Sequence, residues 1–257
     1  HLAGGTYAAA CNSDLLPALI RARELAGDLA AAAGSQWPLP LFGAGLSLGG
    51  TMLLNAALAT PWVLDGLFCA SSPLDLAACS ASIERPRNRL YQHWLLQRLV
   101  RQTLADPFGV REPERQQLEA MARGEQAATI RAFDAAITAP RWSFASVEAY
   151  YSGASPLPRL LELSRRSLLP PTLVLQALDD PWVPAAAAQQ LQAALQTEGG
   201  AAAAGPVSVV LTPQGGHNGF HGRGDGRCNG LKLGCWSDRL ALAWFDQLRV
   251  SAGVCGG

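Results

Sequence analysis

The chain has 257 residues, of which 49% are apolar and 16% charged, and its formal net charge is zero. This balance argues against a disordered chain and against a surface built to bind nucleic acid or another polyanion. The length is sufficient for one α/β domain with a substantial core, or for two small domains.

Neither a membrane segment nor a metal site is predicted. The most apolar window, residues 51–70, contains an asparagine, a proline and an aspartate, so we interpret it as helix, turn and strand rather than as a transmembrane segment. No signal peptide is recognised, and the six cysteines follow no CxxC or repeating spacing. We therefore expect free thiols, a cytoplasmic location and no metal or organic cofactor, while a Cys228–Cys235 disulfide stays conceivable.

In chain order, the first third predicts two helices and two strands. Ser13-Asp14 is a plausible N-cap for a helix that runs to about Ala33, where Gly34-Ser35 ends it. The next segments predict a short apolar strand over 38–44, a helix of small and aliphatic residues over 48–59, and a second buried strand over 62–70.

Residues 71–171 are helical in pattern and richer in arginine, for example over 88–104 and 129–140. Leu90, Trp94, Leu95 and Leu99 are expected to line one face of the first of these helices. This face is either a core-facing stripe or the apolar side of a lid over a substrate channel, and both can hold at once.

After this insertion the alternation of strands and helices resumes. Strands are predicted over 173–177 and 207–212, and helices over 185–196 and 236–248. Strands that alternate with helices indicate a mostly parallel sheet covered by helices on both faces.

Gly45-Leu46-Ser47-Leu48-Gly49 lies between a predicted strand and a predicted helix, where a nucleophile elbow would be. Glycines are expected at these positions because a Cβ atom there would collide with the neighbouring strand and helix. The helix directs its N-terminus at the site, so the Leu48 N–H can donate to an oxyanion. The alternative is a serine in a structural glycine turn.

A base and an acid follow the later strands. His217, in the glycine-flanked loop "TPQGGHNGF", is the candidate base, with His221 as a second candidate four residues on. "ALDDPWVP" ends a strand in two aspartates. We assign Asp180 as the acid that orients the histidine, with Asp179 as the alternative acid. The order Ser, Asp, His is that of α/β-hydrolases.

These motifs together resemble the YheT-like branch of the α/β-hydrolase superfamily, which is related to the mammalian abhydrolase-domain proteins. The similarity runs from about Ser13 to Leu248, and its segments are "GLSLGG", "SSPLDLAA", "NRLYQHWLLQRL", "IRAFDAAITAP", "VEAYYSGAS", "ALDDPWVP" and "GGHNGF". The resemblance implies one α/β-hydrolase domain over 1–257, with a helical lid insertion at about 71–171.

The resemblance further implies a serine hydrolase that cleaves carboxylic esters, lipid or acyl esters among them, through an acyl-enzyme on Ser47. The substrate is then a small-molecule ester or a lipid-like one, and no oligomeric state is indicated. The alternatives are an acyltransferase to alcohols that uses the same residues, and a non-catalytic binding protein with the hydrolase fold.

Three features depart from the family's pattern. Arg141-Trp142-Ser143 stand where a glycine before the phenylalanine is common, which would alter the substrate-facing wall of the lid. The loop over 222–234 is longer than expected. Only one helix and one strand precede Ser47, so we expect the domain to be partial, with its N-terminal strands and a second oxyanion donor before residue 1.

Overall fold

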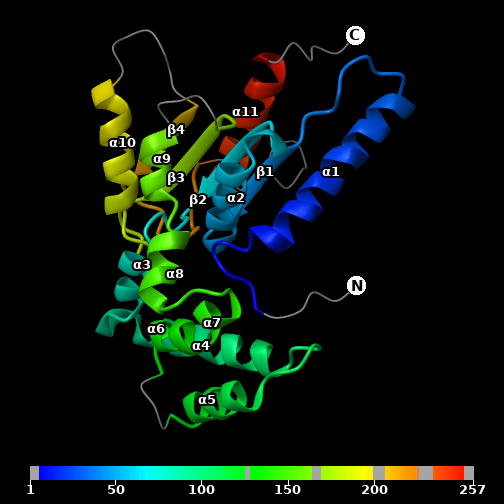
Figure 1. Ribbon diagram of the computed structural model, residues 1–257. Coiled ribbons are helices and arrows are strands. Elements are labelled where there is room, and N and C mark those ends of the chain that lie inside the picture. Colours follow the sequence, from blue (N-terminus) through cyan, green and yellow to red (C-terminus); the bar gives the residue numbers. More distant parts are fainter. Residues whose placement is uncertain are drawn as a thin grey trace.

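A four-stranded parallel sheet lies at the centre of the molecule (Figure 1). The computed structural model describes residues 6–124, 128–163, 169–198, 206–223, 225 and 234–251. The strand order follows the chain: β1 (Phe42–Leu46), β2 (Gly66–Ala70), β3 (Thr172–Ala177) and β4 (Val207–Thr212). The expected α/β class with a parallel sheet flanked by helices is thus confirmed.

Both faces of the sheet are covered by helices. Successive residues of a strand point to opposite faces. On β2, Leu67 and Cys69 accordingly belong to a different core cluster from Phe68 and Ala70. The first face packs against α2 (Leu48–Ala59), α9 (Leu157–Leu163) and α10 (Ala186–Glu198), and the second against α11 (Trp236–Ser251). The first helix, α1 (Asn12–Ala32), packs outside α2.

The α-helices between β2 and α9 form a layer of their own, which contains one core cluster and most of a second. They are α3 (Leu76–Ile83), α4 (Arg89–Leu104), α5 (Glu112–Arg123), α6 (Ile130–Phe133), α7 (Ala139–Arg141) and α8 (Val147–Ala154). In Figure 1, α4 to α8 gather beyond one end of the sheet. This is the end at which the strands finish and Ser47 lies, so the layer covers the predicted site. Its assignment as a lid stays a prediction.

Three predicted boundaries shift. The N-cap of α1 is Cys11 rather than Ser13-Asp14, whose side chains hydrogen-bond to each other at 3.3 Å. β1 starts at Phe42 rather than at residue 38, since prolines in the preceding segment have no N–H for the ladder. β2 starts at Gly66 because Pro61–Val63 forms a 3₁₀ turn instead. The other predicted helices and strands lie within a few residues of the observed ones.

The predicted apolar face of α4 is wrong in half of its residues. Leu90 and Trp94 are 87% and 50% exposed, whereas the buried face carries Gln92, Leu96, Val100 and Thr103. The two remaining predicted residues, Leu95 and Leu99, pack against the insertion's core cluster and also line a pocket. Core packing and pocket lining are therefore combined on these two leucines.

Cys11, Cys69, Cys79 and Cys235 are free thiols in the described part of the chain. The conceivable partner Cys228 and most of the loop over 222–234 lie outside the described residues. No helix in the described ranges is long and apolar enough to cross a membrane.

Candidate active site

Ser47 lies at the turn between β1 and α2, in a backbone conformation that non-glycine residues rarely adopt (φ 52°, ψ −132°). Such a conformation costs on the order of 1–3 kcal/mol and persists only when its surroundings impose it. Here the Ser47 N–H donates to the Ala70 carbonyl at 2.9 Å, which ties the turn to the end of β2. This hydrogen bond therefore helps to fix the backbone of the turn at Ser47.

Glycines permit this close approach of strand and helix. A Cβ atom on Gly45 would overlap the Cα atom of Gly50, and one on Gly50 would overlap the Ser72 hydroxyl. A Cβ atom on Gly49, by contrast, would meet nothing within 4 Å. The expectation that the flanking glycines avoid collisions is thus confirmed for Gly45 and wrong for Gly49, because Gly50 is the residue that faces β1.

The structure brings Ser47, His217 and Asp180 together, although they lie far apart in the chain. The His217 Nε2 atom is 2.9 Å from the Ser47 hydroxyl oxygen, and its Nδ1 atom is 3.0 Å from the Asp180 Oδ2 atom. Both the histidine and the aspartate side chains are buried, at 10% and 0% exposure. With Nδ1 protonated toward Asp180, Nε2 is free to accept the serine proton.

Asp180 is held by the backbone that follows it. Its Oδ1 atom accepts hydrogen bonds from the Trp182 and Val183 N–H groups at 2.9 and 3.0 Å. Burial alone would raise the pKa of Asp180, but the hydrogen bonds from His217 and these two N–H groups outweigh it and hold the pKa below its ordinary value. The carboxylate therefore stays ionised beside the histidine.

Asp179 has a different position. Its Oδ1 atom accepts a hydrogen bond from the Gly216 N–H at 2.7 Å and thereby braces the loop that carries His217. Within the part of the chain that the structure describes, its carboxylate forms no hydrogen bond with the His217 ring.

The loop after β4 turns sharply around His217. Gly215 cannot carry a Cβ atom, which would overlap the Phe220 ring. Asn218 has φ 63°, and its N–H donates to the Ser71 hydroxyl at 3.3 Å. The second candidate base, His221, is 77% exposed in its side chain and pairs with Asp225 at 3.1 Å, so the structure does not bring it to Ser47.

Residues that sequence reasoning missed lie beside the histidine and beside Asp180. The Trp182 ring lies 4.6 Å from the His217 ring and stacks on Tyr91 of α4, with 3.4 Å between ring centroids. Gln176, a buried polar residue within β3, donates to Asp180 Oδ2 at 3.3 Å. A glutamine in an otherwise apolar strand was the available signal for this contact.

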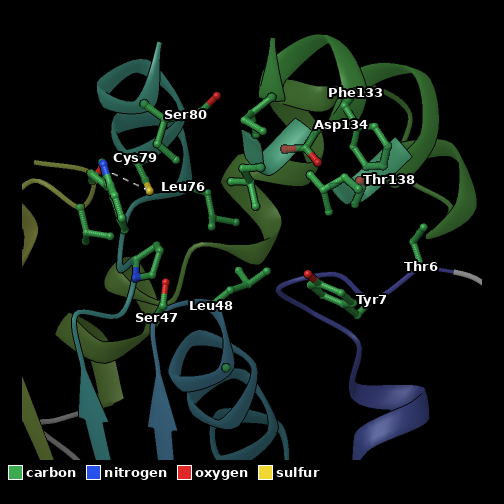
Figure 2. A pocket seen from close by; sticks show the side chains of 18 of the residues that line it. Thr6, Tyr7, Ser47, Leu48, Leu76, Cys79, Ser80, Phe133, Asp134 and Thr138 are labelled. Atoms are coloured by element: carbon green, nitrogen blue, oxygen red, sulfur yellow. Dashed lines mark hydrogen bonds between the residues drawn. The ribbon is translucent and has the colours of Figure 1, made fainter. Parts of the chain in front are cut away.

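Ser47 opens into a pocket of about 620 Å³ between the sheet and the insertion (Figure 2). This volume is typical of small-molecule sites. Its lining is predominantly apolar and includes Leu48, Met52, Ile83, Leu95, Leu99, Ile130, Phe133 and Val183. In Figure 2, Ser47 and Leu48 lie across the pocket from Phe133 and Asp134, and Tyr7 forms a side wall.

Arg141, Trp142 and Ser143 do not form the expected wall. Among the described residues they line a separate surface hollow together with Asp106 and Glu114. Arg141 forms ion pairs with both carboxylates, at 2.8 and 3.0 Å. This departure from the family's pattern therefore concerns the internal structure of the insertion.

Cys79 also lines the pocket, but burial raises the pKa of its thiol to about 12. Its Sγ atom is 3.6 Å from the Trp182 carbonyl oxygen. A thiol that stays protonated is a poor nucleophile, so Ser47 is the better candidate. The described residues contain no group of three or more His, Cys, Asp or Glu side chains that could hold a metal ion.

These features define a class. A parallel sheet with a serine at a strand-to-helix elbow, an aspartate after β3 and a histidine after β4 is the architecture of the α/β-hydrolase fold. No protein-family model matches the chain.

Curated relatives agree with this class. Over 185 residues, 70% of the chain, it is 31% identical to human "Phospholipase ABHD3", of which it covers 41%. It is 32% identical over 189 residues to the Escherichia coli "Putative esterase YheT" and covers 49% of that protein. It is 29% identical over 226 residues to the Synechocystis "Putative esterase slr0264", of which it covers 58%. The resemblance predicted from the motifs is thus confirmed, and the chain spans about half the length of these relatives.

Solved structures match more loosely. A monoacylglycerol lipase of Paleococcus ferrophilus aligns with 90% of the chain and 74% of its own length, at 14% identity and a TM-score of 0.38. The mouse alpha/beta hydrolase domain-containing protein 10 aligns with 88% of the chain and 68% of its own length, at 14% identity and a TM-score of 0.37.

Proposed function

We propose that the protein is a serine hydrolase that cleaves carboxylic esters through an acyl-enzyme on Ser47. The observation that carries this proposal is the continuous hydrogen-bonded chain from Ser47 through His217 to Asp180, placed at the floor of an apolar pocket. The names of the curated relatives, esterases and a phospholipase, support the same reaction class.

Acylation begins with attack of the Ser47 Oγ atom on the ester carbonyl carbon, while His217 Nε2 takes the hydroxyl proton. Asp180 holds the ring through Nδ1 and stabilises its charged form. The carbonyl oxygen gains negative charge near the Leu48 N–H. This N–H lies in the first turn of α2, where the helix offers it no acceptor.

The second half of the reaction reverses these roles. His217 returns its proton to the leaving alcohol as the tetrahedral intermediate collapses to the acyl-enzyme. A water molecule then loses a proton to His217 and attacks the acyl carbon. His217 returns this proton to the Ser47 Oγ atom as the second tetrahedral intermediate collapses, which releases the acid and restores the serine. The chemistry uses only side chains and backbone groups of this chain.

The pocket supports a hydrophobic acyl group as the substrate's main binding element. Leucines of α4, Phe133 of α6 and Met52 of α2 converge on the space above Ser47. Burial of each methylene of an acyl chain against such a surface contributes about 0.8 kcal/mol. Esters of longer acyl chains are therefore expected to be cleaved with higher kcat/KM than acetate esters.

A fluorophosphonate probe tests the nucleophile, because it reacts covalently with an activated serine. We expect the probe to label the full-length protein, and we expect the Ser47→Ala variant to lose the label. Ser152→Ala, a serine on the exposed part of α8, serves as the matched control and keeps it. Labelling that persists in Ser47→Ala would contradict the assignment. Product analysis with and without added alcohol separates hydrolysis from acyl transfer.

A further inference from the structure

The pocket contains one carboxylate that the proposed mechanism does not use. Asp134 lines the pocket on the wall across from Ser47 and Leu48 (Figure 2). The residue is half-buried, yet it lies among apolar and aromatic neighbours that include Phe133, Tyr150 and Tyr151. Among the described residues that line this pocket, none is lysine or arginine. The charge is therefore placed in a largely apolar cavity with no lysine or arginine beside it among the described lining residues.

The backbone at this position departs from a regular α-helix. Residues Asp134–Thr138 form a π-helix between α6 and α7, in a segment for which the sequence predicts an ordinary helix. Single π turns of this kind are rare and occur often at functional sites. The wider turn presents Asp134 and Thr138 on the same wall of the pocket.

Hydrogen bonds fix the carboxylate but do not use up its acceptor capacity. The Tyr151 hydroxyl lies 2.8 Å from Asp134 Oδ2 and 3.0 Å from the Ser80 hydroxyl, so it bridges the two side chains. Thr138 also hydrogen-bonds to the carboxylate. A carboxylate offers about four acceptor sites, so sites remain for a donor that enters from the cavity.

Burial raises the pKa of Asp134 to about 6, although the hydrogen bonds from Thr138 and Tyr151 act in the opposite direction. At neutral pH the side chain is consequently ionised for most of the time. An ionised carboxylate in an apolar cavity is a costly group to keep, and such cost is typical of binding and catalytic positions.

We propose that Asp134 is a specificity-determining residue, and that its carboxylate accepts a hydrogen bond from an O–H or N–H group of the substrate. The apolar lining then binds the hydrocarbon part of the ester, while Asp134 selects esters that carry a donor. This inference rests on the proposed function in one respect: it takes the cavity beside Ser47 as the substrate pocket.

Matched ligand pairs test the inference without requiring turnover. In a Ser47→Ala background, calorimetry compares 2-hydroxyethyl octanoate with propyl octanoate, which has a methyl group in place of the hydroxyl. A second pair, 2-(dimethylamino)ethyl octanoate and 3-methylbutyl octanoate, tests a charged N–H donor. A third pair, ethyl 8-hydroxyoctanoate and ethyl nonanoate, places the donor on the acyl chain.

We expect the donor-bearing member of at least one pair to bind about tenfold more tightly, the effect of a hydrogen bond to a charged group. Adding Asp134→Asn should reduce this preference to below about threefold, and Asp134→Leu should reverse it. Adding Asp28→Asn, an exposed aspartate of α1, should leave it unchanged. The pair that responds identifies the donor as hydroxyl or ammonium and places it on the alcohol or on the acyl part.

Two results would overturn the inference: equal binding within all three pairs, or a preference that survives both Asp134→Asn and Asp134→Leu. Thermal unfolding separates recognition from a structural role. Because the buried charge is costly, Asp134→Asn should leave Tm unchanged or raise it, and a lowered Tm would assign Asp134 to the internal structure of the insertion. Fluorophosphonate labelling that persists in Ser47→Ala would contradict the proposed function. The binding comparison would stay valid, because it does not depend on turnover.

Discussion

Two adjacent aspartates show how one residue position decides which carboxylate meets the histidine. Asp179 and Asp180 follow the same strand, yet only Asp180 reaches the His217 ring, while Asp179 accepts from the Gly216 N–H. The difference arises because the turn after β3 directs Asp180 inward, where the Trp182 and Val183 N–H groups hold it.

Substitution of these aspartates should therefore have unequal effects. Asp180→Asn should lower kcat by about 10³–10⁴-fold, because an amide favours the wrong histidine tautomer and cannot stabilise the charged ring. Asp179→Asn keeps an oxygen that can accept from Gly216, so its activity should stay within about threefold of the original. Steady-state hydrolysis of p-nitrophenyl octanoate measures both variants. The opposite ranking would assign Asp179 as the acid.

Two glycines at the elbow give a second pair of substitutions with opposite expected effects. Gly45→Ala should destabilise the protein by about 2–3 kcal/mol, because its Cβ atom would overlap the backbone of Gly50. Gly49→Ala should stabilise it by about 0.5–1 kcal/mol, since alanine loses less entropy in a helix and the Cβ atom meets nothing within 4 Å. Urea unfolding measures both changes, and equal losses at both positions would contradict the packing observed between β1 and α2.

Among the helices, α7 is joined to the segment after α4 and to α5 by one arginine. Arg141 pairs with Asp106 at 2.8 Å and with Glu114 at 3.0 Å, and the three side chains are 13%, 3% and 6% exposed. Ion pairs this deeply buried differ from surface pairs, because removal of one partner leaves a charge without compensation.

Arg141→Ala should destabilise the protein by about 3–5 kcal/mol near neutral pH. Burial alone would raise the pKa of Glu114, but the hydrogen bonds from Arg141 and Arg111 outweigh it and lower the pKa to about 2. Because the folded pKa lies below the ordinary value of 4.5, the stabilisation by Glu114 is complete above pH 4.5 and is lost as the pH falls toward 2. The difference between the native protein and Arg141→Ala should shrink over that range.

Urea unfolding at pH 7 and at pH 3 provides the measurement. Arg131→Ala is the control, since Arg131 pairs with Glu148 on the surface and both side chains are about half exposed. Its effect should stay below about 1 kcal/mol at either pH. A loss in Arg141→Ala that does not depend on pH would argue against the role of Glu114.

Across the whole molecule, the pocket is assembled from five parts of the chain that are remote in sequence. The elbow supplies its floor and the insertion supplies the opposite wall. The loops after β3 and β4 supply Trp182, Val183 and His217, and the segment before α1 supplies Thr6 and Tyr7. This segment is attached to the insertion, because the Trp142 indole N–H donates to the Thr6 carbonyl at 2.8 Å and the Ala9 N–H donates to the Tyr150 hydroxyl at 3.0 Å.

Trp142→Phe removes the first of these bonds and keeps an aromatic ring in place. We expect KM for p-nitrophenyl octanoate to rise by about two- to fivefold, the effect of one lost hydrogen bond of about 0.5–1 kcal/mol. The value of kcat should stay within twofold, because the wall does not touch the reacting atoms. Trp62→Phe, at an exposed tryptophan outside the pocket, should change neither constant. A fall in kcat alone in Trp142→Phe would refute this account of the wall.

The sequence predicted best where local pattern and neighbouring structure agree. The buried strands after residue 171 and the helix α2 follow from apolar runs and small residues, and the polar residues that follow β1, β3 and β4 indicated a common edge of the sheet. The α4 face was mispredicted because Leu90 and Trp94 are exposed, whereas polar Gln92 and Thr103 are buried. Apolarity alone does not tell which side of such a helix meets its neighbours.

The parts of the site that the sequence did not predict depend on tertiary contacts. The π turn at Asp134 has no local signal, since its residues would also suit an α-helix. Likewise, the position of Gln176 beside Asp180, and the choice of Gly50 rather than Gly49 at the contact with β1, follow from how strands and helices pack. A one-dimensional pattern identifies the residue types but not the neighbour that each of them meets.

The order of the strands has a consequence for how the protein folds. Neighbouring strands are consecutive in the chain, but residues 71–171 separate β2 from β3, so their pairing closes a very long loop. Closing such a loop is entropically costly and slows folding. The elbow can form early from β1, β2 and α2, whereas Asp180 and His217 arrive only with β3 and β4. During synthesis and refolding, the proposed nucleophile would therefore exist before its proposed base, and the proposed reactivity would be acquired as the final strands join the sheet.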